Sequence, residues 1–300
     1  MAIIINDNPN EDVKNVVLSD DGTGYGIHIP SLIINYNEGE ILKRYFQDNK
    51  NNILLLLNTI IEVTFEIERE LQTDYTIWYS PDHSSIYPLI NDLYAYHQEM
   101  SAFTKLDIHL GFSSHLTYKE GDTQAKDNCY GAGKYCGVPG KYGITDGRVI
   151  LNEALNQKCI YNYAYENDKT NLFWEYMITF YQQCILTSNF NEECSQQAMS
   201  DASVPEDPIK KCIDSSFEER RPSLRPTCKN KILDSELEIR QNHYITKLPM
   251  ILINGRVYKG NFNAESIFEA LCAGLVSKPE ACRALPGYSN EKASAFLISN

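Results

Sequence analysis

The sequence predicts an α/β fold in which a small mixed sheet is interrupted by a long, disulfide-bonded helical insertion. Residues 244–262 (YITKLPMILINGRVYKGNF) combine a Leu-Pro step with two short apolar strands joined by an Asn-Gly turn, a strong hairpin signal. Far upstream, residues 75–79 and 106–110 are expected to be strands on either side of a helix. A strand–helix–strand order predicts a parallel pair with a right-handed crossover. Together these two halves are typical of a thioredoxin-like core.

Residues 1–61 are expected to form a separate, β-rich part that precedes this core. Residues 16–47 read as short strands alternating with turns, and NEGEILKRYF within them places Ile41, Leu42 and Tyr45 on one side of a short helix. So short a stretch cannot close a sheet by itself, so it is interpreted as about half of a small domain.

The apolar run Asn52–Phe65 (NILLLLNTIIEVTF) is interpreted as one or two buried strands. It is too short to cross a bilayer and contains Asn58, so no membrane span is expected in this chain. The N-terminal residues MAIIINDNPNEDVKN lack the basic start and long apolar core of a signal peptide. Neither a signal peptide nor a membrane anchor is therefore expected here. The chain is interpreted as a fragment, as a shortened expressed protein, or as the product of a gene whose first exon is missing from the sequence.

Residues 62–118 are expected to supply the first part of the thioredoxin-like domain. Tyr75–Tyr79 reads as a strand, and Ser85 is a suitable N-cap for the helix that follows it, in which Pro88 is tolerated in the first turn. The apolar residues of this helix follow the i, i+3, i+4, i+7 spacing: Ile86, Leu89, Ile90 and Leu93.

Residues 119–243 are expected to form the insertion, a cysteine-containing loop followed by helices. The loop is rich in glycine, and Cys129 and Cys136 are placed to staple it. Residues 148–243 read mostly as helix, and Trp174 begins an apolar stripe that we interpret as core packing. The other members of the stripe are Met177, Ile178 and Tyr181.

Residues 244–300 complete the thioredoxin-like domain and carry the tail. Asn254-Gly255 predicts a type I′ turn between two strands. Asn263 is expected to cap the next helix, whose core-facing residues are Ile267, Leu271 and Leu275.

All nine cysteines lie at or after position 129, which predicts a disulfide-stapled C-terminal part in an oxidising compartment. The alternative is a set of buried free thiols in the cytosol. Cys272 and Cys282 are close enough in sequence to pair, and a further bond is expected within the group Cys184, Cys194 and Cys212. At least three disulfides are expected, and the odd count leaves one thiol over or pairs it outside this chain. The structural candidates are Cys129, Cys136, Cys159, Cys184, Cys194, Cys212, Cys272 and Cys282.

The sequence lacks the chemistry of a dithiol enzyme. It contains no C-x-x-C, and the turn WYSPDHSSIY, where the reactive cysteine of such a fold would lie, offers Ser80, His83, Ser84 and Ser85 instead. A hydroxyl group cannot take part in thiol–disulfide exchange. A hydrolase based on Ser80 and His83 lacks an evident third group or oxyanion loop. The chain is therefore predicted not to be an enzyme.

Neither a metal nor a cofactor is predicted. His109 and His115 flank LGFSS, but no partner has zinc-ligand spacing, so hydrogen-bonded or exposed histidines are expected. No phosphate-binding glycine motif occurs. The formal net charge of −13 disfavours nucleic acid and anionic membrane surfaces, which need a basic face.

Several segments resemble the luminal region of the vacuolar sorting receptors. Residues 174–200 (WEYMITFYQQCILTSNFNEECSQQAMS) followed by IKKCIDSS show that family's tryptophan-rich helix and cysteine progression. Residues 133–159 resemble its Gly-x-Tyr-Cys loop and Leu-x-x-Leu-Cys helix. Residues 248–275 resemble its Leu-Pro, Asn-x-x-x-Tyr-x-Gly and Ala-Leu-Cys-x-Gly order. Residues 26–46 (GIHIPSLIINYNEGEILKRYF) look like the closing half of a protease-associated domain.

The resemblance implies a non-catalytic protein-binding module of the endomembrane lumen (Golgi, prevacuolar or vacuolar) or the extracellular space, involved in protein transport of soluble cargo. The partners implied are protein or peptide cargo. It also implies that Pro249 is cis, so that a strand edge near Pro249, Ser84 and Ser85 can receive a peptide backbone. Two alternatives stay open: a luminal thiol-disulfide oxidoreductase or chaperone, and a structural subunit of a larger assembly.

Overall fold

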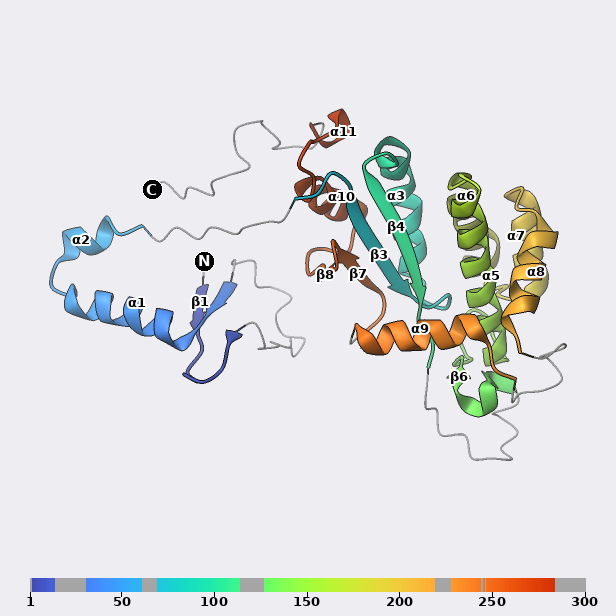
Figure 1. Cartoon of the computed structure of the whole chain (residues 1–300), viewed down its shortest axis with the longest axis horizontal. Helices are drawn as coiled ribbons and strands as arrows, with labels where there is room; N and C mark the ends of the chain where they lie inside the picture. The colour runs from blue at the N-terminus through green and yellow to red at the C-terminus, as the bar shows by residue number, and fades with distance from the viewer. Residues whose placement is uncertain are drawn as a thin grey trace. The chain divides into compact units, whose positions relative to one another are not determined.

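The chain divides into two compact units, the first ending at Phe65 and the second beginning at Glu66. Figure 1 shows the computed structural model of the chain, which describes residues 2–13, 31–60, 69–113, 127–218, 228–243, 245 and 247–283. No helix in these described ranges is long and apolar enough to cross a membrane.

The first unit pairs two strands in parallel beside a helix. Strand β1 (Ala2–Ile5) runs alongside β2 (Ser31–Ile34), and helix α1 (Tyr36–Asp48) follows β2 directly. Gly39 lets α1 approach β1 closely, because a Cβ at this position would lie 2.0 Å from Cγ2 of Ile5. The expected strand at residues 15–21 lies outside the described residues.

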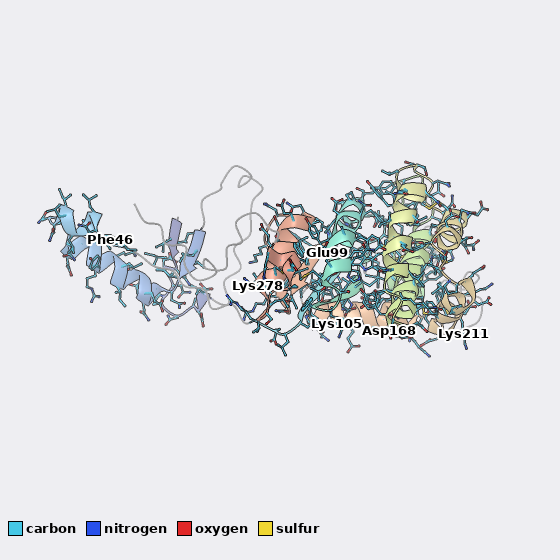
Figure 2. The ribbon with its side chains drawn as sticks, turned by 90° about the horizontal axis from the view of Figure 1, so that it is seen from above. Phe46, Glu99, Lys105, Asp168, Lys211 and Lys278 are labelled. Atoms are coloured by element: carbon cyan, nitrogen blue, oxygen red, sulfur yellow. A yellow bond between two sulfur atoms is a disulfide. The ribbon has the colours of Figure 1, made fainter. Side chains whose placement is uncertain are left out.

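The interpretation of the leucine run as buried strands is wrong for Ile53–Leu57, and residues 61–65 of the run lie outside the described residues. Its described part is a short exposed helix, α2 (Ile53–Leu57), and Leu54 is 75% exposed. Asn52 initiates this helix, since its side chain accepts a 3.1 Å hydrogen bond from the N–H of Leu55. In a continuous apolar run, periodicity cannot show whether the segment is a strand or a helix. Phe46 on α1, labelled in Figure 2, is also exposed, at 40%.

The second unit contains a four-stranded sheet in the order β4-β3-β7-β8. Strand β3 (Thr73–Tyr79) pairs in parallel with β4 (Thr104–Leu110) and antiparallel with β7 (Met250–Ile253). Strand β8 (Arg256–Val257) pairs antiparallel with β7 and ends the sheet. Segments about 175 residues apart in the sequence therefore form one sheet, as the sequence predicts.

The turns and helices around this sheet follow local sequence signals with one exception. Asn254 and Gly255 both have positive φ, of 47° and 74°, as the hairpin turn between β7 and β8 requires. Asn263 caps α10 (Ala264–Ala273) by accepting a 2.9 Å hydrogen bond from the N–H of Ser266. Ser85 precedes α3 (Ile86–Met100), but its side chain makes no capping hydrogen bond, because its backbone is already helical. A short helix, α11 (Glu280–Arg283), follows α10.

The insertion between β4 and β7 is mostly helical, and Figure 1 shows α5–α8 standing next to α3, while α9 runs across their direction toward the lower end of α5. Its core is aromatic: on α6, Phe173, Trp174 and Phe180 are fully buried, whereas Ile178 and Tyr181 of the predicted stripe are half-buried. The elements are β5 (Cys129–Tyr130), η3 (Gly131–Gly133), β6 (Tyr135–Cys136), α5 (Gly147–Glu166), α6 (Asn171–Phe180), η4 (Tyr181–Ile185), α7 (Glu192–Asp201), α8 (Glu206–Ser216) and α9 (Lys231–Asn242).

Four disulfides staple the second unit. Cys272 on α10 is bonded to Cys282 on α11, and Cys228 is buried outside these four bonds. The other three bonds lie in the insertion: Cys129–Cys136 between β5 and β6, Cys159–Cys212 between α5 and α8, and Cys184–Cys194 between η4 and α7.

Candidate functional site

The turn after β3 carries hydroxyl groups where a dithiol fold carries sulfur. Ser84 and Ser85 are exposed, whereas Ser80 is buried and its hydroxyl donates a short hydrogen bond to the carboxylate of Asp82. The N–H of His83 donates to the Ser80 carbonyl at 2.9 Å and closes the turn. This geometry is that of an ordinary polar turn before a helix. It offers no group that could transfer disulfide electrons.

Pro249 lies at the same end of the sheet as this turn. Met250 pairs with Trp78, so the residue before Met250 lies where β3 runs into the turn. The Leu248–Pro249 peptide bond is cis, as the resemblance implies. Leu248 packs against Gly111, where an added Cβ would lie 2.0 Å from its Cδ1. The predicted surface residues are thus at one end of the sheet.

The outer edge of β4 is closed to further strands. One backbone group of each of Leu106, Ile108 and Leu110 is hydrogen bonded to a side chain of α5 or α9. Their partners are the Tyr161 hydroxyl (2.7 Å), the Lys158 ammonium and the Glu236 carboxylate (3.0 Å).

The opposite edge, β8, is open in the part of the chain that the structure describes. The N–H of Tyr258 donates to the carbonyl of Ile251 at 2.8 Å, so Tyr258 faces β7. Backbone groups alternate sides along a strand, which points the N–H of Val257 away from β7. Val257 is 43% exposed, and β8 is the last strand in the sheet order. An extended peptide can add to this edge.

His109 belongs to a buried ion-pair cluster under the sheet. Its Nδ1 lies 2.9 Å from Glu236 and its Nε2 lies 3.3 Å from Asp107, while Lys158 lies 3.1 Å from Glu236. The ring stacks on Trp78 at 4.3 Å. Burial lowers the pKa of His109, but hydrogen bonds to both carboxylates outweigh it and hold this pKa above its ordinary value. The cluster joins β4 to α5 and α9.

No three metal-ligating side chains gather in the described residues. His109 is occupied by carboxylates, and His115 lies outside the described ranges. The residues that the structure describes therefore offer no metal centre.

A cavity of about 380 Å³ opens between α5, α7 and α8 in the insertion. Lys211 on α8, labelled in Figure 2, lies beside the cavity-lining residue Lys210. Two of the disulfides hold the walls: Cys159–Cys212 joins α5 to α8, and Cys184–Cys194 anchors the start of α7. The cavity is therefore covalently braced.

Glu153 is a buried carboxylate in the cavity wall, 4% exposed. It accepts hydrogen bonds from the Ser195 hydroxyl (2.6 Å), the Tyr176 hydroxyl (2.8 Å) and Nε2 of Gln157 (2.6 Å). Burial raises the pKa of Glu153 to about 7, and these donors only partly offset that effect. Asn156 completes the polar wall by donating to Ser195 at 2.8 Å.

This network continues to the strand end. Oε1 of Gln157 accepts a 2.8 Å hydrogen bond from Tyr79 at the end of β3, and the Tyr87 hydroxyl donates to the carbonyl of Pro81 at 2.7 Å. Nε2 of Gln157 lies 3.4 Å from the Tyr87 hydroxyl. Hydrogen bonds thus connect the cavity wall to the Ser80–Ser85 turn. Sequence reasoning missed this cavity. The available signal was Glu153 amid the apolar residues of the α5 segment RVILNEALNQKC.

The model of the vacuolar sorting receptor thioredoxin-like domain matches residues 92–272, more than half of the chain. The chain belongs to this family. The match spans the insertion, the cavity and the β7–β8 hairpin. It confirms the resemblance found in the sequence and the thioredoxin-like fold class with its helical insertion.

Relatives in plants show the same affiliation. Vacuolar-sorting receptor 3 of Arabidopsis thaliana is 24% identical over 302 residues, which cover 96% of this chain and 46% of the receptor. Vacuolar-sorting receptor 6 of the same plant is 27% identical over 175 residues, which cover 55% of this chain and 26% of the receptor. Vacuolar-sorting receptor 1 of Pisum sativum is 24% identical over 174 residues, covering 56% and 27%. The chain spans less than half the length of these relatives.

Two solved structures from Mycobacterium tuberculosis are similar in outline. Reduced DsbA matches with a TM-score of 0.43 and 9% identity, covering 76% of this chain and 96% of that one. Reduced DsbG, a disulfide bond oxidoreductase, matches with a TM-score of 0.42 and 8% identity. The match covers 71% of this chain and 84% of DsbG.

Proposed function

We propose that this chain is a non-catalytic, luminal protein-binding module of a sorting receptor, and that it binds an extended segment of soluble protein cargo at the β8 edge. The observation that carries the proposal is the asymmetry of the sheet. Side chains of α5 and α9 cap the β4 edge, whereas β8 presents Val257 outward. A segment that adds to β8 would gain backbone hydrogen bonds, with specificity from alternate side chains.

The turn chemistry supports binding over redox turnover. Ser84 and Ser85 replace the thiols, and eight of the nine cysteines are in disulfides. The ninth, Cys228, is buried and lies outside the turn. A thiol–disulfide exchange needs an accessible thiolate as the attacking group.

The disulfides and the family support the location. Four disulfides form and persist in an oxidising compartment, which fits the endomembrane lumen. The curated relatives are sorting receptors by name, and this chain would take part in the same transport of soluble cargo. We also propose that residues 1–61 are the end of a protease-associated domain, as the resemblance of residues 26–46 implies.

The test uses the substitution Val257→Pro, which removes the outward N–H without removing a β7–β8 hydrogen bond. Val257→Thr is the matched control, since it keeps both the N–H and the β-branched shape. Each immobilised protein is offered the soluble lumenal proteins of secretory vesicles, and the captured proteins are identified by mass spectrometry. The proposal predicts a set that the wild type and Val257→Thr share and Val257→Pro loses.

Other outcomes contradict the proposal in different ways. Capture that is equal for all three proteins would place the binding surface elsewhere. Recovery of fixed partners in constant proportion, in place of cargo, would favour the structural-subunit alternative. Reduction of insulin by the wild type above background would restore the oxidoreductase alternative.

A further inference from the structure

We propose that the cavity between α5, α7 and α8 is a binding site for a small organic cation, an ammonium group carried on an apolar body. The site is separate from the β8 edge and independent of the proposed cargo function. It is defined by the lining of the cavity, which contains both buried and exposed carboxylates and a set of apolar side chains.

The size and bracing of the cavity suit a small molecule. Its volume of about 380 Å³ lies within the range of roughly 300–1,000 Å³ that is usual for ligand pockets. Three helices and two disulfides form the walls, so the cavity is held open without a ligand. Less ordering is then needed on binding, which favours affinity for a small ligand.

The polar part of the lining favours positive charge. Glu153 is buried in the wall, with Asn156 and Ser195 beside it. Three exposed carboxylates and one ammonium complete the charged lining: Glu192, Glu206, Asp214 and Lys210. Lys210 is exposed, and its long stem can carry the ammonium group into water. Four carboxylates against one ammonium attract a cation and repel an anion.

The apolar part of the lining fixes the body of the ligand. It comes from the same three helices and from the two phenylalanines that flank α7 and α8. These residues are Val149, Phe190, Met199, Ile209, Ile213 and Phe217. An aliphatic or aromatic body buried against them gains the free energy of apolar transfer, while a bare metal ion or a fully polar cation would gain nothing there.

Glu153 should lose its proton when the cation binds. The groups that face its carboxylate are uncharged donors from α5, α6 and α7, and the charged groups of the cavity lining are those named above. A bound ammonium group stabilises the ionised carboxylate. Burial holds the pKa of Glu153 near 7, so binding should strengthen as the pH rises through this value.

The experiment titrates the whole chain with 2-phenylethylamine, followed by protein-detected NMR, with 2-phenylethanol and phenylacetate as the neutral and anionic counterparts. The proposal predicts that the amine binds with shifts at α5, α7 and α8, and that the alcohol and the carboxylate bind at least about tenfold more weakly. The affinity for the amine should fall at pH 5.5 relative to pH 8, while the amine itself stays protonated at both values.

Two variants localise the site. Glu153→Gln should weaken amine binding about tenfold. Gln196→Trp places a bulky side chain at an exposed position of the lining and should abolish binding without disturbing the core. Gln197→Trp, on the same helix but outside the lining, is the matched control and should bind as the wild type does. Because Gln196 and Gln197 are both exposed, this pair keeps the test valid even if Glu153→Gln fails to fold.

Three results would overturn the proposal. The first is the absence of any shift with up to about 10 mM amine, an affinity too weak for a built site. The second is equal binding of the amine, the alcohol and the carboxylate. The third is unchanged amine binding by Gln196→Trp.

Discussion

Ser195 on α7 donates a 2.6 Å hydrogen bond to the carboxylate of Glu153 on α5. This contact joins two walls of the cavity and holds a buried carboxylate between them. The same carboxylate receives the Tyr176 hydroxyl of α6 at 2.8 Å. Three helices of the insertion therefore share one titratable group, whose charge costs free energy when it forms.

Glu153→Gln should change how stability depends on pH. The pKa of Glu153 is raised from an ordinary value of 4.5 to about 7, so the folded state holds the proton more tightly than the unfolded state. The stability from this proton is fully present below about pH 4.5 and is lost as the pH rises through 7, by about 3 kcal/mol. Urea unfolding at several pH values should show that loss in the wild type and not in the variant. Parallel pH curves for both proteins would contradict this assignment.

His97→Phe should remove a loss of stability that occurs as the pH falls. His97 is buried and stacks on Trp174 at 4.6 Å, and burial lowers its pKa from 6.5 to about 4. Its contribution is complete above pH 6.5 and is lost as the pH falls toward 4, by up to about 3 kcal/mol. Phenylalanine keeps the ring contact and removes the titration. The variant should therefore resist acid unfolding better than the wild type, as monitored by circular dichroism. Equal acid midpoints would show that His97 does not control this transition.

Gly137→Ala should destabilise the start of α5. A Cβ at Gly137 would lie 2.0 Å from the carbonyl oxygen of Gly147, and backbone cannot move as a side chain can. The expected cost is about 2 kcal/mol or more, measured by thermal unfolding. Gly111→Ala is the comparison, since its Cβ would meet the mobile Cδ1 of Leu248, and it should cost less. A smaller loss for Gly137→Ala than for Gly111→Ala would contradict this packing.

Removal of the Cys159–Cys212 bond should cost more than removal of the Cys272–Cys282 bond. The two bonds span 53 and 10 residues, so chain entropy predicts losses of about 4 and about 3 kcal/mol for the paired serine variants. The first pair also joins α5 to α8, and its loss should loosen the cavity. Urea unfolding measures both losses. The reverse order of stability would show that native contacts outweigh the loop-closure effect.

Insulin reduction in the presence of dithiothreitol should proceed at the background rate. Ser84 and Ser85 cannot form a mixed disulfide, and Cys228 is buried. Ser84→Cys combined with Ser85→Cys tests whether only the thiols are lacking at this turn. Turnover by the unaltered chain, retained in Cys228→Ser, would show a redox function.

The parts of the fold that were predictable from the sequence rest on local signals. Asn254-Gly255 specifies the hairpin and Asn263 the start of α10, because turn and cap geometry depends on one or two residues. The pairing of β3 with β7 could be inferred from their apolar strands on either side of the insertion. The prediction of strands in the leucine run is wrong for Ile53–Leu57, since a continuous apolar run has no period that separates a helix from a strand, and Asn52 caps a helix there.

Some of the candidate site residues could likewise be located from the sequence, and others could not. Pro249 and the Ser84–Ser85 turn could be found because the fold fixes their place along the chain. The cavity could not be found, because Glu153 and Ser195 are 42 residues apart and meet only through helix packing. The closure of the β4 edge depends on Lys158, Tyr161 and Glu236 reaching a strand far from them in sequence.

The most direct measurement of the central claim is hydrogen exchange at the amide of Val257, with and without a captured cargo protein. In the free chain this N–H points away from β7 and should exchange quickly. A cargo segment added to β8 would accept its hydrogen bond, so the account predicts strong protection of Val257 in the complex. Tight cargo binding that leaves the Val257 amide exchanging at its free rate would contradict it.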